Sequence, residues 1–188
     1  MSTPAFKAMK LYRNYDGNKS TFGETSVAAS GPNPDLVSCF AARRADGALT
    51  IMAINKQPDT NATATITFTN FLPAGVAQIW RLTSANVITA LTPQNITGNT
   101  FTNVLPAQSI TLFVLPGGTP PQMSSASASA GLFQFQLSGQ VGQRYAILAS
   151  SNLVNWVALQ TNNLASSPQT ITFGLTNAQR FYRAQWVP

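Results

Sequence analysis

Runs of apolar residues with the length of β-strands recur through most of the chain, and polar and apolar positions alternate within residues 62–69. Residues 36–44 and 48–56 form two of these runs, and Ala45-Asp46-Gly47 separates them. Asp-Gly between two such runs predicts a tight hairpin. Further runs follow at short, regular intervals, at residues 62–69, 76–83, 87–91, 100–104 and 109–115. This spacing predicts an antiparallel β-sandwich over residues 25–116.

The first 24 residues follow a different pattern. Pro4 stands where a helix would begin, and the segment up to Arg13 carries apolar residues at helical spacing (Ala5, Phe6, Ala8, Met9 and Tyr12). Proline is favoured in the first turn of a helix, where its missing N–H costs nothing. We therefore expect residues 1–24 to form one short helix and a loop.

A segment rich in proline, glycine and serine at residues 117–130 predicts a linker. Beyond it, residues 131–188 contain five shorter strand patterns, at 132–137, 144–149, 155–160, 169–173 and 180–186. In the first of these, Phe133, Phe135 and Leu137 share one face. The fold class predicted for the whole chain is all-β, with two antiparallel β-sandwich domains joined by this linker and one short N-terminal helix.

Charge is sparse and unevenly distributed. Only 9% of residues are charged, well below the roughly 25% of an average soluble domain. All five carboxylates lie in the first third, and only four arginines carry charge after residue 60. The net charge of +6 therefore reflects missing acids and not a track of basic residues, which argues against nucleic-acid binding. No apolar run approaches membrane-spanning length, so we expect no membrane partner.

The sequence offers little for catalysis or for a cofactor. The chain has no histidine, the commonest general base and metal ligand, and Cys39 has no second cysteine to pair with. Asp16, Asn18, Ser20 and Glu24 offer oxygen ligands for calcium, but they lack EF-hand spacing, and a hydrogen-bonded loop is favoured. We expect no catalytic residue, no metal site and no cofactor.

Several short motifs carry a family resemblance. They are AFK at 5–7, LYRNYDG at 11–17, FG at 22–23, TSV at 25–27, DGALT at 46–50, INK at 54–56 and LPAQSIT at 105–111. They resemble the C-terminal region of glycoside hydrolase family 44, endoglucanases and xyloglucanases in which a retaining (β/α)₈ barrel precedes a β-sandwich. The resemblance implies that residues 4–15 correspond to the last barrel helix and residues 25–115 to the sandwich.

Nearly the whole of that barrel has no counterpart here, so no catalytic glutamate is carried over. Glycoside hydrolysis needs two carboxylates flanking the sugar, and Asp16 and Asp46 each precede glycine as turn formers. The family's sandwiches also take strand material from the enzyme's N-terminus, which implies an unpaired strand edge and self-association there. Residues 131–188 are similar to a small β-module of secreted proteins from environmental bacteria, which implies no particular activity.

Sugar binding is the chemistry that the remaining residues support, because aromatic rings stack on pyranose C–H faces and polar side chains reach the hydroxyls. The tryptophans Trp80, Trp156 and Trp186 are the candidates, with core packing favoured for Trp80. Strand alternation places Val157 and Leu159 on an apolar face, and Trp156 with Ala158 and Gln160 on the other. In the last strand it turns Tyr182, Ala184 and Trp186 inward. The predicted carbohydrate-binding residues are Trp156, Phe181, Arg183 and Gln185.

Two hypotheses remain open. In the first, the chain is a non-catalytic accessory region of a secreted enzyme that degrades plant polysaccharide, and it binds cellulose, xyloglucan or another β-glucan. In the second, the first sandwich braces the catalytic barrel, and the second sandwich is a spacer or surface-attachment module. Both imply that the signal peptide lies outside this chain.

Overall fold

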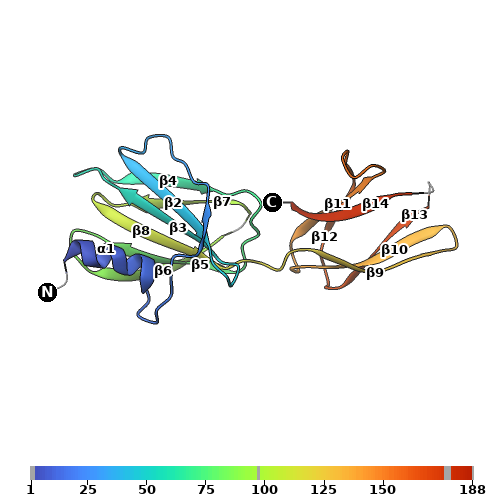
Figure 1. The fold of residues 1–188 in the computed structure, drawn as a ribbon, viewed down its shortest axis with the longest axis horizontal. Coiled ribbons are helices and arrows are strands. Elements are labelled where there is room, and N and C mark those ends of the chain that lie inside the picture. The colour runs from blue at the N-terminus through green and yellow to red at the C-terminus, as the bar shows by residue number, and fades with distance from the viewer. Residues whose placement is uncertain (1–2, 97, 176–178, 188) are drawn as a thin grey trace. The chain divides into compact units, whose positions relative to one another are not determined.

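The computed structural model describes residues 3–96, 98–175 and 179–187. The chain divides into two units, which we call unit 1 (Met1–Gly117) and unit 2 (Gly118–Pro188). Each unit is built from antiparallel strands, and unit 1 also carries a short helix (Figure 1). The all-β prediction is confirmed. No helix in the described part of the chain is long and apolar enough to cross a membrane.

Helix α1 (Pro4–Arg13) forms where the sequence predicts it. Thr3 caps its start, because the Oγ1 atom accepts a hydrogen bond from the Phe6 backbone N–H at 3.2 Å. Lys10 and Arg13 stand in the last turn, where the helix dipole favours positive charge. The helix lies on one face of the main sheet of unit 1 (Figure 1). Its Leu11 side chain is fully buried against that sheet.

The main sheet of unit 1 has six strands in the order β1-β2-β3-β8-β5-β6, and β4 and β7 form a separate two-stranded sheet (Figure 1). Within the described residues, β4 and β7 each have one edge that pairs with no other strand. Self-association through such an edge stays a prediction. The bounds are β1 Thr25–Val27, β2 Val37–Arg43, β3 Leu49–Asn55, β4 Ala62–Thr67, β5 Val76–Leu82, β6 Ile88–Asn95, β7 Thr100–Leu105 and β8 Ser109–Leu115.

Strands β3 and β8 are the centre of unit 1, since both of their faces are covered. On one face, residues such as Ile51 and Phe113 pack with Phe101 of β7 in the core between the two sheets. On the other face, Met52 and Leu112 pack beneath α1. The near-continuous apolar runs of these strands bury side chains on both faces of the main sheet, and this burial holds α1, the main sheet and the two-stranded sheet together.

Unit 2 contains two three-stranded sheets, in the orders β13-β10-β9 and β12-β11-β14. Aromatic rings join them: Tyr182 stacks on Phe133 at 4.6 Å and on Phe173 at 5.7 Å between ring centroids. Tyr182 therefore points inward, as predicted. The bounds are β9 Gln122–Ser129, β10 Leu132–Ser138, β11 Arg144–Ser150, β12 Val157–Asn163, β13 Gln169–Gly174 and β14 Phe181–Val187.

The prediction of a linker over residues 117–130 is wrong for most of that segment. Gln122–Ser129 is strand β9, which pairs with β10. Its serine and alanine side chains are small and mostly exposed, so its order comes from backbone hydrogen bonds to β10 and not from a buried face of its own. The missed signal is Ala130-Gly131, whose positive φ values of 51° and 77° make the two-residue hairpin turn that joins the strands.

Candidate functional site

The carboxylates of unit 1 are held in loop structure. Both oxygens of Asp16 accept hydrogen bonds, from the Ser20 hydroxyl at 2.6 Å and from the backbone N–H groups of Asn18 and Ser20 at 2.8 and 3.3 Å. Partial burial by itself would raise the pKa of the Asp16 carboxyl, but these hydrogen bonds together hold that pKa below its ordinary value. Asp16 is therefore an ionised loop anchor.

Asp46 and Glu24 have similar structural roles. Asp46 forms an ion pair with Arg44 at 2.7 Å, and the other guanidinium nitrogen of Arg44 donates to the Tyr15 hydroxyl. Glu24 accepts a hydrogen bond from the backbone N–H of Ala45. A general acid in glycoside hydrolysis needs a carboxyl whose pKa is raised, whereas the hydrogen bonds to Asp16 hold the pKa of that carboxyl below its ordinary value. Within the described residues, no three side chains of the metal-binding types gather in one place.

The predicted site residues of unit 2 lie on the sheet β12-β11-β14. Phe181, Arg183 and Gln185 occupy alternate positions of β14, opposite Ser150, Leu148 and Ala146 of β11. They therefore share the face that is turned away from the aromatic core, because Tyr182 between them points inward. Arg183 and Gln185 are exposed, and Phe181 is half-buried. The prediction that these three share a polar face agrees with this register.

Trp156 stands just before β12 and is half-buried. Its indole Nε1–H donates to the Leu153 carbonyl at 3.0 Å, which fixes the ring against its own loop. The Asn152 side chain orders that loop, since its Oδ1 accepts from the backbone N–H groups of Val154 and Asn155 at 3.0 and 2.9 Å. The position of the indole is thus set by the loop and not by a strand.

Arg183 reaches across the sheet to Trp156. Its guanidinium carbon lies 4.4 Å from the centroid of the indole ring, within the range of a cation–π contact. The structure therefore brings these two predicted residues together, although they are 27 positions apart. One face of the indole is covered by the guanidinium, so the pair presents the planar cation and the ring edge together.

One detail of the alternation in β12 is wrong. A register shift between Ile147 and Leu148 places Ala158 opposite Leu148 and Gln160 opposite Ile147. Ala158 and Gln160 therefore lie on opposite faces, because Leu159 is the extra residue of a β-bulge. Val157, expected on an apolar face, is 65% exposed. The pattern of apolar and polar residues in so short a run does not indicate a bulge.

Sequence reasoning missed the loop residues beside Trp156. Leu153 and Val154 are exposed, Val154 by 77%, and with Val157 they add apolar surface next to the Trp156–Arg183 pair. Apolar side chains in a loop of polar residues were the available signal. The other two tryptophans lie elsewhere: Trp186 donates to Gln143 from β14, and Trp80 packs against Tyr15 in unit 1 at 5.6 Å.

Comparison with known proteins places this geometry in context. No family model matches the chain. A bifunctional glucanase-xylanase from a metagenome library, CelM2, is 54% identical with a TM-score of 0.61 over 62% of this chain and 23% of that protein. A Paenibacillus polymyxa xyloglucanase from glycoside hydrolase family 44 is 32% identical with a TM-score of 0.56 over 59% of this chain and 22% of that protein. About 60% of the chain therefore matches part of glycoside hydrolase family 44 proteins.

A curated relative agrees with this assignment. Endoglucanase A of Paenibacillus lautus is 30% identical over 122 residues, which cover 63% of this chain and 17% of that enzyme. Unit 1 holds 117 of the 188 residues, so these shares are close to its size. The chain spans about a fifth of the length of the proteins it matches. The similarity therefore concerns a glycoside hydrolase-related region and not a whole enzyme.

Proposed function

We propose that this chain is a non-catalytic accessory region of a secreted glycoside hydrolase that degrades plant polysaccharide, and that unit 2 binds cellulose, xyloglucan or another β-glucan. The single observation that supports the binding role is the Trp156–Arg183 pair on the outer face of unit 2. The family 44 similarity supports the choice of ligand, because relatives of the partial region are named for glucan and xyloglucan.

The pair has the chemistry that a neutral glycan requires. The indole contact restrains the guanidinium, so Arg183 presents its N–H donors to sugar hydroxyls with little loss of side-chain entropy on binding. Phe181 and Gln185 on the same face of β14 supply an apolar and an amide contact. Exposed Leu153 and Val154 extend the apolar contact to the next sugar. No carboxylate lies in unit 2, so nothing there would catalyse hydrolysis through an acidic pair.

Affinity electrophoresis of the whole chain in gels that contain hydroxyethyl cellulose, xyloglucan, barley β-glucan or xylan tests this role. We expect retardation by at least one β-glucan, a loss of about tenfold or more in affinity for Trp156→Ala, and a similar loss for Arg183→Leu, which keeps apolar packing on the indole. Phe6→Ala, which removes an exposed aromatic ring from unit 1, is the matched control and should bind normally. Retardation unchanged in both unit 2 variants would refute the site.

A second function, bracing of a catalytic barrel by unit 1, is favoured by the surface of α1. Phe6 and Met9 are 58% and 69% exposed on the helix, while Leu11 is buried against the sheet. Three residues apart, Phe6 and Met9 form an apolar stripe of the kind that a packed partner covers. Mixing this chain with a family 44 barrel expressed without its sandwich should give a complex that Met9→Glu disrupts and Val154→Glu leaves intact. If the unaltered chain forms no complex with the barrel, the bracing function is excluded.

A further inference from the structure

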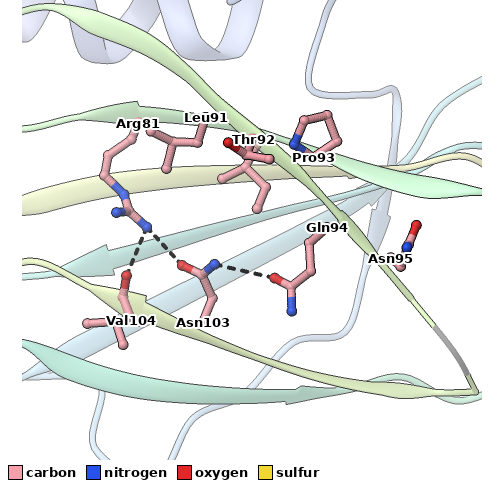
Figure 2. A pocket seen from close by; sticks show the side chains of 9 residues that line it. Arg81, Leu91, Thr92, Pro93, Gln94, Asn95, Asn103 and Val104 are labelled. Carbon is pink, nitrogen blue, oxygen red and sulfur yellow. Dashed lines mark hydrogen bonds between the residues drawn. The ribbon is translucent and has the colours of Figure 1, made fainter.

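Unit 1 has a groove between strand β6 of the six-stranded sheet and strand β7 of the two-stranded sheet (Figure 2). Its volume is about 650 Å³, within the range that holds a sugar unit. A β-bulge shapes it: Thr92 and Pro93 together oppose the single residue Gln78 of β5. Proline cannot donate to a strand ladder, so Pro93 is tolerated because β6 is an edge strand.

The floor of the groove is a chain of hydrogen bonds (Figure 2). The Nη2 atom of Arg81 donates to the Asn103 Oδ1 and to the Val104 carbonyl, both at 2.8 Å. The Asn103 amide in turn donates to Gln94 Oε1 at 3.4 Å. Gln94 donates to the Thr102 carbonyl at 3.1 Å. These contacts hold the polar side chains in fixed orientations facing the groove, which lowers the entropic cost of binding a polar ligand.

Arg81 is a half-buried cation whose partners are all neutral. Besides Asn103 and Val104, its Nε donates to the Thr111 hydroxyl at 3.0 Å, and its Nη1 makes no hydrogen bond within the described residues. Among the described residues, the one ion pair joins Arg44 to Asp46 and does not involve Arg81. Burial lowers the pKa of the Arg81 guanidinium from its ordinary value, as expected for a cation that loses solvent without gaining an anion.

We propose that this groove binds a hexuronic acid unit of an acidic polysaccharide, with the sugar carboxylate on the Arg81 guanidinium. The sugar carboxylate accepts a hydrogen bond from the free Nη1 atom and supplies the negative counter-charge that the Arg81 guanidinium lacks. The ring hydroxyls meet the amides of Gln94, Asn95 and Asn103, and the C–H groups meet the apolar lining. An added protein strand fits less well, because side chains already occupy the Thr102 and Val104 carbonyls at the edge of β7.

The inference rests on the proposed function only for the class of ligand, a polysaccharide. Its residues belong to unit 1, and the Trp156–Arg183 pair belongs to unit 2. Trp156→Ala should therefore leave uronate binding unchanged. If β-glucan binding fails while uronate binding depends on Arg81, the unit 2 proposal falls and the groove stands.

The test compares glucuronoxylan with the same polymer after its carboxyl groups have been reduced to alcohols, by isothermal titration calorimetry on the whole chain. We expect the acidic polymer to bind at least about tenfold more tightly, and the difference to shrink as salt rises from 20 to 500 mM, ionic strengths chosen to screen the charge. Arg81→Gln should abolish the difference. Arg144→Gln removes the same charge from an exposed position in unit 2 and should keep it.

A second pair of variants guards against a loss of folding in Arg81→Gln, since Arg81 also ties β5 to β7. Thr92 lines the groove from β6 and is exposed. Thr92→Glu places a repelling carboxylate at the groove and should abolish uronate binding, whereas the neutral Thr92→Gln should preserve more of it. Equal binding of the acidic and reduced polymers would overturn the proposal. So would equal losses in Arg81→Gln and Arg144→Gln, which would indicate attraction between a cationic protein and a polyanion.

Discussion

Asn55, at the end of β3, is the sharpest test of how unit 1 is held together. The side chain is 1% exposed, and its Nδ2 atom donates to the backbone carbonyls of Thr60, Leu105 and Pro106 at 2.9, 3.0 and 2.9 Å. Its Oδ1 accepts from the Gln57 backbone N–H at 3.1 Å. One buried amide therefore connects the central sheet to the loop before β4 and to the end of β7. Asn55→Ala removes all of these contacts.

The cost follows from the groups that are left behind. A net hydrogen bond contributes about 1 kcal/mol, and a buried carbonyl left without a donor costs about 1–3 kcal/mol. Two N–H groups serve three carbonyls here, so the loss counts as two to three bonds. We expect unit 1 to lose about 2–4 kcal/mol of unfolding free energy. With a urea dependence of about 2 kcal/mol per molar, the middle of the usual range, the midpoint should fall by about 1–2 M.

Urea unfolding followed by Trp80 fluorescence measures this, in a background where Trp156 and Trp186 are replaced by phenylalanine so that unit 1 alone reports. Asn55→Asp is the informative comparison, because a carboxylate of similar shape faces three carbonyl oxygens without a proton to donate. It should destabilise unit 1 more than alanine at pH 7, and less at acid pH, where the protonated group donates one bond. A change below about 0.5 kcal/mol for Asn55→Ala would refute the assignment of Asn55 as a structural anchor.

Two further predictions concern one loop in each unit. The folded-state pKa of Asp16 lies below its ordinary value, so its ionised form contributes stability that is present above the unfolded pKa of about 3.9 and lost as pH falls through the folded pKa. Asp16→Asn should therefore lower the unfolding free energy of unit 1 by about 1 kcal/mol or less at pH 7, and should weaken the dependence of that free energy on pH in the acid range, measured by circular dichroism. An unchanged dependence on acid pH would contradict this. In unit 2, a Cβ at Gly139 would lie 2.8 Å from the fully buried Tyr145 ring, so Gly139→Ala should cost about 1–3 kcal/mol in urea unfolding. Gly174→Ala, where a Cβ meets nothing within 4 Å, is its control, and equal effects of the two would argue against the predicted clash.

Much of the fold was predictable because local pattern and tertiary environment agree. The residues of α1 carry helical spacing and a proline at the start, and the β8 residues 109–115 form a strand with the predicted bounds. The predictions failed for strands that form through backbone hydrogen bonds without a clear pattern of apolar side chains. β9 has too little apolar surface to be seen as a strand, and β6 continues through Pro93 because an edge strand tolerates a missing donor.

The candidate surface of unit 2 was partly predictable for the same reason. Alternation along β14 determined that Phe181, Arg183 and Gln185 share a face, since a strand has a period of two. The contact of Arg183 with Trp156 depends on which strands are neighbours and on the bulge in β12, and neither is local. The groove beside Arg81 was not predicted at all, because its lining comes from strands of two different sheets, and the sequence pattern does not show how those sheets face each other.

The sequence by itself determined the all-β class, the helix, most strands and the motifs that resemble family 44. These depend on residue type and spacing, which act over a few residues. Only the tertiary structure decided that β9 is a strand, that Trp156 lies under Arg183 and that Arg81 faces a groove without a carboxylate beside it. The last two depend on contacts between segments distant in sequence, and β9 depends on its backbone hydrogen bonds to β10, so backbone hydrogen bonds and packing outweigh local preference in each case.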